Sequence, residues 1–170
     1  REMKEINRQD RTFLHAKSSY YQKITGSSGA ERVPVCAYLN AIVDHITEEY
    51  ADKLGDVTLT AHCDGDWTIG NTAGIPAGVI ATELLLNSIT HAFSEGEAGR
   101  IDLSLTREED WFILQVRDSG KGLPEEVTRG QPSSPGLAMV ENLAMQLSGT
   151  AGFANDGGAR IRIIFPDPGA

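Results

Sequence analysis

The feature that most limits the fold of this chain is a pair of strand-like segments separated by only four residues. Segment 101–106, I-D-L-S-L-T, alternates apolar and polar side chains, and segment 111–117, W-F-I-L-Q-V-R, is rich in β-branched and aromatic residues. The connection R-E-E-D has the length of a hairpin loop, so the two strands are expected to pair antiparallel. Antiparallel sheets commonly bury one face and expose the other.

The remaining periodic segments supply further strands and amphipathic helices. Strand patterns lie at 56–62, just after the turn 64–67, and at 159–165, and helix patterns lie at 33–50, about 76–93 and about 136–148. Each helix has one apolar side rather than being apolar all round. The sequence therefore predicts an α/β fold, a two-layer sandwich with a mixed, mostly antiparallel sheet and helices on one face, preceded by an N-terminal helix within residues 1–24.

Length and charge exclude several classes of function. A chain of 170 residues is one domain, or one domain with an appendage. The net charge of −9 argues against nucleic acid or an anionic membrane as the main partner, because phosphate contacts need clustered Lys and Arg. It does not exclude a nucleotide, whose phosphate charge a magnesium ion can offset. No apolar run approaches the roughly 20 residues of a membrane span. Because the chain begins at Arg1 without methionine, we expect a fragment or a processed form.

The two cysteines, Cys36 and Cys63, form no recognisable motif. There is no C-x-x-C and no nearby pair of histidines, so neither a zinc site nor a disulfide framework is indicated. We expect two packed thiols in a reducing compartment.

Three polar side chains follow each other at helical spacing in the apolar segment E-L-L-L-N-S-I-T-H-A-F. Glu83, Asn87 and His91 are four residues apart and line one narrow strip of the helix. The opposite, core-facing stripe is expected to contain Leu85, Leu86, Ile89, Ala92 and Phe93. Taken alone, the strip is either a solvated helix face or a set of groups that converge on a ligand.

Two glycine clusters follow further along the chain. In D-S-G-K-G-L-P, Asp118 ends a strand, and Gly120 and Gly122 allow a positive φ or a close approach of a ligand to the backbone. In S-S-P-G-L-A-M-V, Gly136 begins a helix whose N–H groups could bind an anion. Each cluster alone could equally be a tight turn or an ordinary helix start. The polar residues 125–135 between them have the length of a small lid.

The order of these motifs resembles a known superfamily. E-x-x-x-N-x-x-x-H, then D-x-G-x-G, then a short lid and a glycine that begins a helix, resembles the Bergerat-type ATP-binding fold of gyrase, the heat-shock chaperone, the mismatch-repair ATPase and histidine kinases. The resemblance covers about 33–166. The details are similar to a bacterial sensor histidine kinase, in the short-lid subfamily whose phosphoacceptor helix contains a His-Arg-x-x-Asn motif.

The N-terminus carries part of this resemblance. F-L-H-A-K-S-S-Y-Y-Q, 13–22, resembles the end of the second dimerisation helix of that subfamily. The implied organisation is the end of a dimerisation segment at 1–25, a linker at 26–32 and an ATP-binding catalytic domain at 33–168. His15 does not match the phosphoacceptor position, so the acceptor histidine is expected outside this chain.

The resemblance implies roles for the helix strip. Asn87 would supply a carboxamide oxygen to Mg²⁺, and Glu83 would hold a water near the ion or act as the catalytic general base. His91, or Thr90 beside it, would face the phosphates. Many relatives carry Lys at the position of Thr90, so one positive charge is absent here.

It also implies roles for the glycine clusters. Asp118 would accept a hydrogen bond from the adenine amino group, while Gly120 and Gly122 would let the backbone pass under the base and hinge the lid. Many relatives have a threonine at the position of Ala159, where it helps hold a water at the adenine. The phosphates would bind the N–H groups of Gly136, Leu137 and Ala138.

The implied function is that the domain binds Mg-ATP and donates the γ-phosphate to a histidine of a dimerisation helix, in its own or a partner chain. A response regulator would then take the phosphate. We expect a cytoplasmic protein with no nucleic-acid partner and no direct membrane contact. Two alternatives remain open: an anti-sigma-factor serine kinase of the same fold, and a phosphotransfer or scaffold protein that does not bind ATP.

Overall fold

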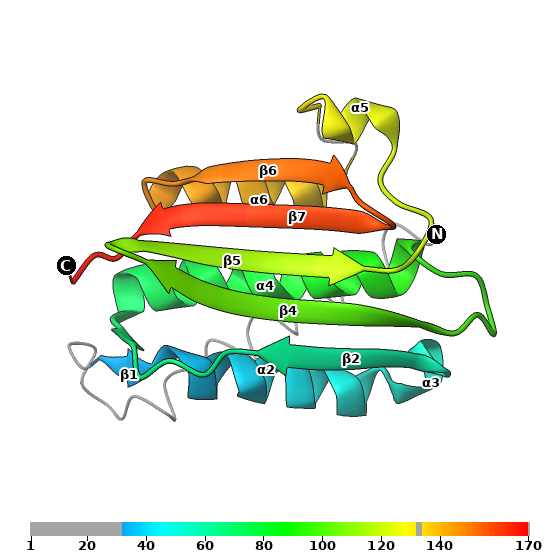
Figure 1. Ribbon diagram of the computed structural model, residues 1–170, viewed down its shortest axis with the longest axis horizontal. Helices are drawn as coiled ribbons and strands as arrows, with labels where there is room; N and C mark the ends of the chain where they lie inside the picture. The colour runs from blue at the N-terminus through cyan, green and yellow to red at the C-terminus, as the bar shows by residue number, and fades with distance from the viewer. Residues whose placement is uncertain (1–31, 132–133, 170) are drawn as a thin grey trace.

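The two segments 101–106 and 111–117 pair antiparallel, as predicted, within a larger sheet. A computed structural model of the chain describes residues 32–131 and 134–169. Its main sheet has the strand order β2-β4-β5-β7-β6 and is shown face-on in Figure 1. The strands are β2 (Val57–His62), β4 (Gly99–Glu108), β5 (Trp111–Asp118), β6 (Thr150–Asn155) and β7 (Ala159–Pro166). Only β2 and β4 pair parallel; the other three pairs are antiparallel. The predicted mixed, mostly antiparallel sheet is confirmed.

The helices cover one face of this sheet. In Figure 1 the three long helices lie behind the strands, and the front face of the sheet is open. The helices are α2 (Val35–Glu49), α3 (Ala51–Leu54), α4 (Asn71–His91), α5 (Glu125–Thr128) and α6 (Pro135–Gln146). A separate two-stranded sheet pairs β1 (Val33–Pro34) with β3 (Thr68–Ile69). The two-layer α/β sandwich is therefore confirmed, whereas the expected N-terminal helix and the segment 1–25 lie outside the described residues.

Alternation along the strands decides which side chains fill the core. Phe112 on β5 and Phe165 on β7 are 0% and 1% exposed, and their ring centroids lie 5.5 Å apart. Trp67 meets Phe112 edge-on at 5.8 Å. These inward-facing rings bind the sheet to the helix layer, since burying large aromatic side chains is a principal source of stability.

Helix α4 is the central helix of the layer. It begins at Asn71, before the predicted start near Pro76, because Gly70 caps it and Pro76 is accommodated inside the helix. Ile80, Leu84 and Leu85 are fully buried. Of the predicted core stripe, Leu85 and Ala92 are buried, and Leu86, Ile89 and Phe93 are partly buried.

The length and composition of α4 alone would let it cross a membrane. Of its most apolar window, 56% is buried inside the domain. Packing against α2, α6 and the sheet explains why this helix is so apolar.

The prediction of two free thiols is wrong. Cys36 in the first turn of α2 and Cys63 after β2 form a disulfide, with their Cα atoms 5.2 Å apart. The pairing depends on how α2 packs near the end of β2, and no local motif marks it across a sequence separation of 27 residues.

Reducing this disulfide should destabilise the domain. Opening a loop of this length should lower the free energy of unfolding by about 3 kcal/mol and Tm by roughly 6–12 °C. Thermal unfolding with and without a reductant measures the effect. The double variant Cys36→Ser, Cys63→Ser is the control and should not respond to the reductant. A wild-type Tm that the reductant leaves unchanged, or two titratable thiols in the oxidised protein, would contradict the pairing.

Strand β6 and helix α5 are among the elements that were not predicted, for different reasons. Strand β6 reads T-A-G-F-A-N, and its small residues hide the apolar alternation that marks the other strands. Helix α5 is a single turn within the expected lid, too short for a periodic pattern to show.

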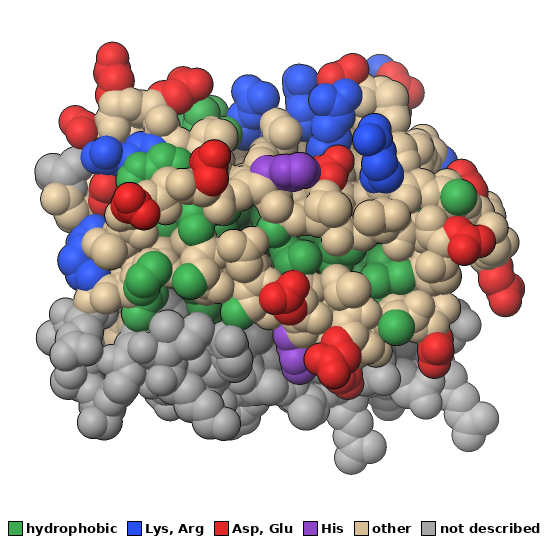
Figure 2. Space-filling view, turned by 60° about the horizontal axis from the view of Figure 1, so that its bottom comes forward, with side chains coloured by type: hydrophobic (Ala, Val, Ile, Leu, Met, Phe, Trp, Pro, Cys, Tyr) green, Lys and Arg blue, Asp and Glu red, His purple; other side chains and the backbone are tan. Residues whose placement is uncertain are grey.

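The charge on the domain is unevenly distributed. Although the chain is acidic, Arg100, Arg117, Arg160 and Arg162 lie at alternate positions on the open face of the sheet, opposite the buried residues. Asp156 pairs with two of them, at 3.0 Å from Arg117 and 3.5 Å from Arg160. Figure 2, tilted so that this face turns upward, shows basic side chains gathered along its top and acidic ones spread more widely.

Candidate functional site

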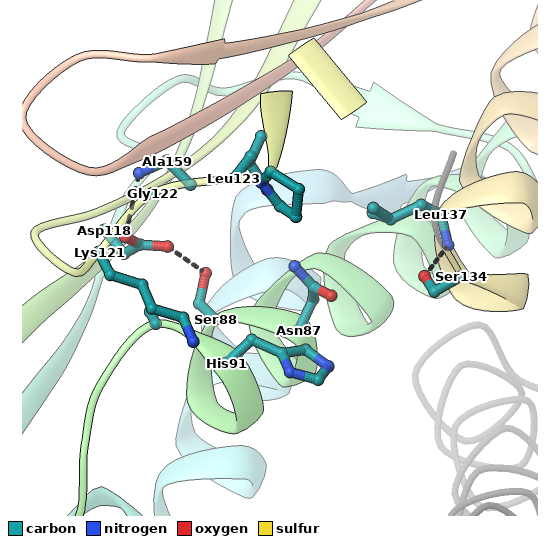
Figure 3. A pocket seen from close by; sticks show the side chains of 12 residues that line it. Asn87, Ser88, His91, Asp118, Lys121, Gly122, Leu123, Ser134, Leu137 and Ala159 are labelled. Atoms are coloured by element: carbon teal, nitrogen blue, oxygen red, sulfur yellow. Dashed lines mark hydrogen bonds between the residues drawn. The ribbon is translucent and has the colours of Figure 1, made fainter. Parts of the chain in front are cut away.

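A pocket of about 280 Å³ lies where α4, the turn after β5 and the start of α6 meet (Figure 3). Its lining combines apolar side chains with a few polar groups, which is typical of small-molecule sites. The lining residues are Asn87, Ser88, His91, Ala92, Asp118, Lys121, Gly122, Leu123, Pro124, Ser134, Leu137 and Ala159. Residues from the three predicted motifs are therefore brought together around one cavity.

Asp118, at the end of β5, is held in one orientation at the closed side of this pocket. It is 4% exposed. Its Oδ1 accepts hydrogen bonds from the N–H groups of Gly120 at 3.0 Å and Ala159 at 3.1 Å. Its Oδ2 accepts from the hydroxyl of Ser88 at 2.9 Å. A carboxylate has about four lone-pair sites, so three donors leave one acceptor position for a group in the pocket.

Ser88 is a site residue that the sequence analysis missed. It lies on the buried side of α4, is 3% exposed, and its only marker in the sequence is a polar residue next to Asn87 on an apolar helix. Its partner Asp118 is 30 residues away in the chain. A buried polar side chain needs a partner, and this rule is the one signal that would have pointed to it.

The glycines of the turn after β5 serve different purposes. A Cβ on Gly120 would lie 2.2 Å from the carbonyl oxygen of Ala92, so Gly120 lets the turn pack against the end of α4. Gly122 has φ +86° and lines the pocket. The side chain of Asn155 fixes the next residue, accepting from the N–H of Leu123 at 2.7 Å and donating to its carbonyl at 3.0 Å. The turn is therefore anchored at both ends.

The polar strip of α4 faces the pocket and α6. Asn87 and His91 line the pocket, and Figure 3 shows both side chains at its α4 side. Glu83 does not line it, but a Cβ on Gly136 would lie 2.9 Å from Glu83 Oε2. The Glu83 carboxylate therefore lies against the start of α6. Thr90 is exposed and does not line the pocket.

The start of α6 is capped by Ser134. The Ser134 hydroxyl accepts a hydrogen bond from the N–H of Leu137 at 3.2 Å, and its carbonyl accepts from the N–H of Ala138 at 3.1 Å. Leu137 lines the pocket, whereas Gly136 and Ala138 do not. In this conformation two of the three N–H groups predicted to bind phosphate are thus bonded within the helix.

Comparisons with known proteins show the family to which this chain belongs. Residues 72–169 match the family described as histidine kinase-, DNA gyrase B- and HSP90-like ATPases. The match spans more than half of the chain, which belongs to this family. Blue-light-activated histidine kinase 2 of Erythrobacter litoralis (strain HTCC2594) is 27% identical over 136 residues, 79% of this chain and 38% of that protein. The chain thus spans less than half the length of this curated relative.

Solved structures share the fold. The histidine kinase domain of the blue-light activated histidine kinase of Erythrobacter litoralis EL346 gives a TM-score of 0.81 at 21% identity, over 94% of this chain and 74% of that one. The ATP-binding domain of PrrB from Mycobacterium tuberculosis gives a TM-score of 0.65 at 21% identity, over 83% of this chain and 99% of that one. Histidine kinase AdeS of Acinetobacter baumannii gives a TM-score of 0.64 at 18% identity, over 94% of this chain and 76% of that one. The predicted resemblance to the ATP-binding domain of histidine kinases is confirmed.

Proposed function

We propose that the chain binds ATP in this pocket, with Asp118 accepting a hydrogen bond from the adenine amino group. The observation that carries the proposal is the buried Asp118 carboxylate, which three donors hold in place while one acceptor position is left over. Adenine presents an amino donor at its C6 position, whereas guanine presents a carbonyl acceptor there. An acceptor that cannot turn away therefore selects adenine.

The residues on α4 fit a magnesium ion bound with the phosphates. Mg²⁺ takes oxygen ligands and is commonly held by one or two protein groups together with phosphates and water. Asn87, whose side chain faces the pocket, would supply a carboxamide oxygen. When bound, the ion would neutralise phosphate charge. Glu83, which lies against Gly136, would hold a water near the ion or act as a general base.

We further propose that the γ-phosphate is transferred to a histidine on a dimerisation helix, in the same chain or a partner, and from there to a response regulator. Support comes from membership in the family of histidine kinase-like ATPases and from the curated relative, which is a histidine kinase. We place the domain in the cytoplasm because ATP is available there. The Cys36–Cys63 disulfide does not support this placement, because disulfides are rare in reducing compartments.

Nucleotide selectivity tests the binding proposal. Calorimetric titration with Mg-ATP and Mg-GTP should show binding of the adenine nucleotide and affinity for the guanine nucleotide at least about 100-fold weaker, because guanine places an acceptor against the carboxylate. Equal affinities for the two nucleotides would contradict the role of Asp118.

The chemistry of the phosphorylated product tests the transfer step. With ATP labelled in the γ-phosphate and a dimerisation-helix protein as acceptor, the proposal requires a label that acid removes and base does not, as for phosphohistidine. A label that survives acid would indicate a serine kinase instead.

A further inference from the structure

Lys121 places a positive charge at the mouth of the pocket. The described residues contain two lysines, Lys53 on α3 and Lys121 in the turn after β5, and only Lys121 lines the pocket. Figure 3 shows its side chain leaving the turn beside Asp118 and extending toward His91. The lysine lies between the two glycines of D-S-G-K-G, at a position to which the motif assigns no role.

The backbone under Lys121 is fixed. Its N–H donates to the carbonyl of Ala92, the residue after α4, at 3.0 Å. Gly120 before it has no room for a Cβ, and Gly122 after it has φ +86°. The first atoms of the side chain are therefore aimed along the end of α4, while the exposed ammonium keeps the freedom of a flexible four-carbon stem.

The ammonium of Lys121 has no partner inside the described part of the domain. No carboxylate of residues 32–131 or 134–169 lies within 4.0 Å of it. The neighbouring carboxylate, Asp118, is already bonded to three donors. Arg129, the residue after α5, by contrast pairs with Glu125 at 2.5 Å. Lys121 is thus an unpaired cation at the mouth of a pocket in an acidic chain of net charge −9.

We propose that Lys121 binds the polyphosphate of the nucleotide by a charge-assisted hydrogen bond and so determines affinity for phosphorylated ligands. The proposal rests on the proposed function. Asp118 would recognise the base at the closed end of the pocket, and Lys121 would neutralise part of the phosphate charge at its mouth. Lys121 is the one Lys or Arg among the described residues that line the pocket, so in an acidic protein its charge should have a large influence on anion binding.

Affinities for ADP and adenosine separate a phosphate contact from general damage to the site. The variants are Lys121→Ala, Lys121→Gln, which keeps most of the stem, and Lys121→Arg, which keeps the charge; Lys53→Ala is the matched control. We expect Lys121→Ala and Lys121→Gln to weaken Mg-ADP binding by about 5- to 20-fold. Their affinity for adenosine should stay within about twofold of the wild-type value. Lys121→Arg should retain most of the affinity, and Lys53→Ala all of it. Added salt should reduce the difference in Mg-ADP affinity between wild type and Lys121→Gln, because salt screens the charge of the lysine.

Three results would overturn the inference. The first is an unchanged affinity of Lys121→Gln for Mg-ADP while the wild type binds it. The second is an equal loss for adenosine and ADP, which would indicate a role in the shape of the turn. The third is failure of the wild-type chain to bind adenosine or Mg-ADP at all, which would overturn the proposed function along with it.

Discussion

Asp118→Asn should lower the affinity for Mg-ADP by at least about 100-fold while the domain stays folded. Two backbone N–H groups require an oxygen at the Oδ1 position, so the new amide must place its NH₂ where Oδ2 was. The Ser88 hydroxyl can rotate to accept from it. The position left for the ligand then becomes a donor and opposes the adenine amino group. Calorimetric titration of wild type and variant measures the loss.

Asp156→Asn is the control for this substitution. Asp156 is a half-exposed carboxylate that pairs with Arg117 on the open face of the sheet, away from the pocket lining. Its substitution should leave nucleotide affinity unchanged. Retained affinity in Asp118→Asn, with a Tm close to that of the wild type, would show that the ligand does not use this carboxylate.

Gly158→Ala should be the most damaging change in the turn before β7. Gly158 has φ +137°, which L side chains rarely adopt. An added Cβ would also lie 1.9 Å from the carbonyl oxygen of Asp118 and 3.0 Å from its Oδ1. Backbone strain and the clash together should lower the free energy of unfolding by about 3 kcal/mol. Because the shift falls on Asp118, we expect nucleotide binding to weaken as well.

The adjacent Gly157→Ala is a matched control. Gly157 has φ +64°, and nothing lies within 4 Å of an added Cβ. Gly157→Ala should lower the free energy of unfolding by only about 1 kcal/mol and leave nucleotide binding unchanged. Thermal unfolding and titration of both variants separate the two effects. Equal destabilisation by the two substitutions would contradict the close packing of Gly158 on Asp118.

The sheet was predictable where alternation and a short loop act together. The hairpin of β4 and β5 follows from a four-residue connection between two strand patterns, and the buried Ile161, Ile163 and Phe165 follow from their two-residue spacing along the last strand. The parallel pairing of β2 with β4 depends on the packing of α4, the helix that lies between them in the chain, and no local pattern indicates it. The disulfide was not predicted for the same reason: it depends on how α2 packs near the end of β2, and no local pattern indicates it.

The site was predictable only as far as its motifs extend. Asn87, His91, Asp118, Gly122 and Leu137 were named from sequence and line one pocket. Their roles toward ATP and Mg²⁺ stay predictions.

The residues missed at the site are those whose importance comes from distant partners. Ser88 matters because it bonds Asp118 across 30 residues, and Lys121 because its turn packs on the end of α4. Motif spacing places residues within one element, whereas these contacts depend on how elements pack.

The central claim is that this pocket binds a magnesium–adenine nucleotide, and thermal unfolding with and without Mg-ADP tests it most directly. With ligand at about 100 times its Kd, binding should add about 2.7 kcal/mol to the free energy of unfolding. For a domain of this size Tm should rise by roughly 5–11 °C, and a chelator should remove most of the rise. No change in Tm at millimolar Mg-ADP would contradict the account and leave Glu83, Asn87 and His91 as a solvated helix face.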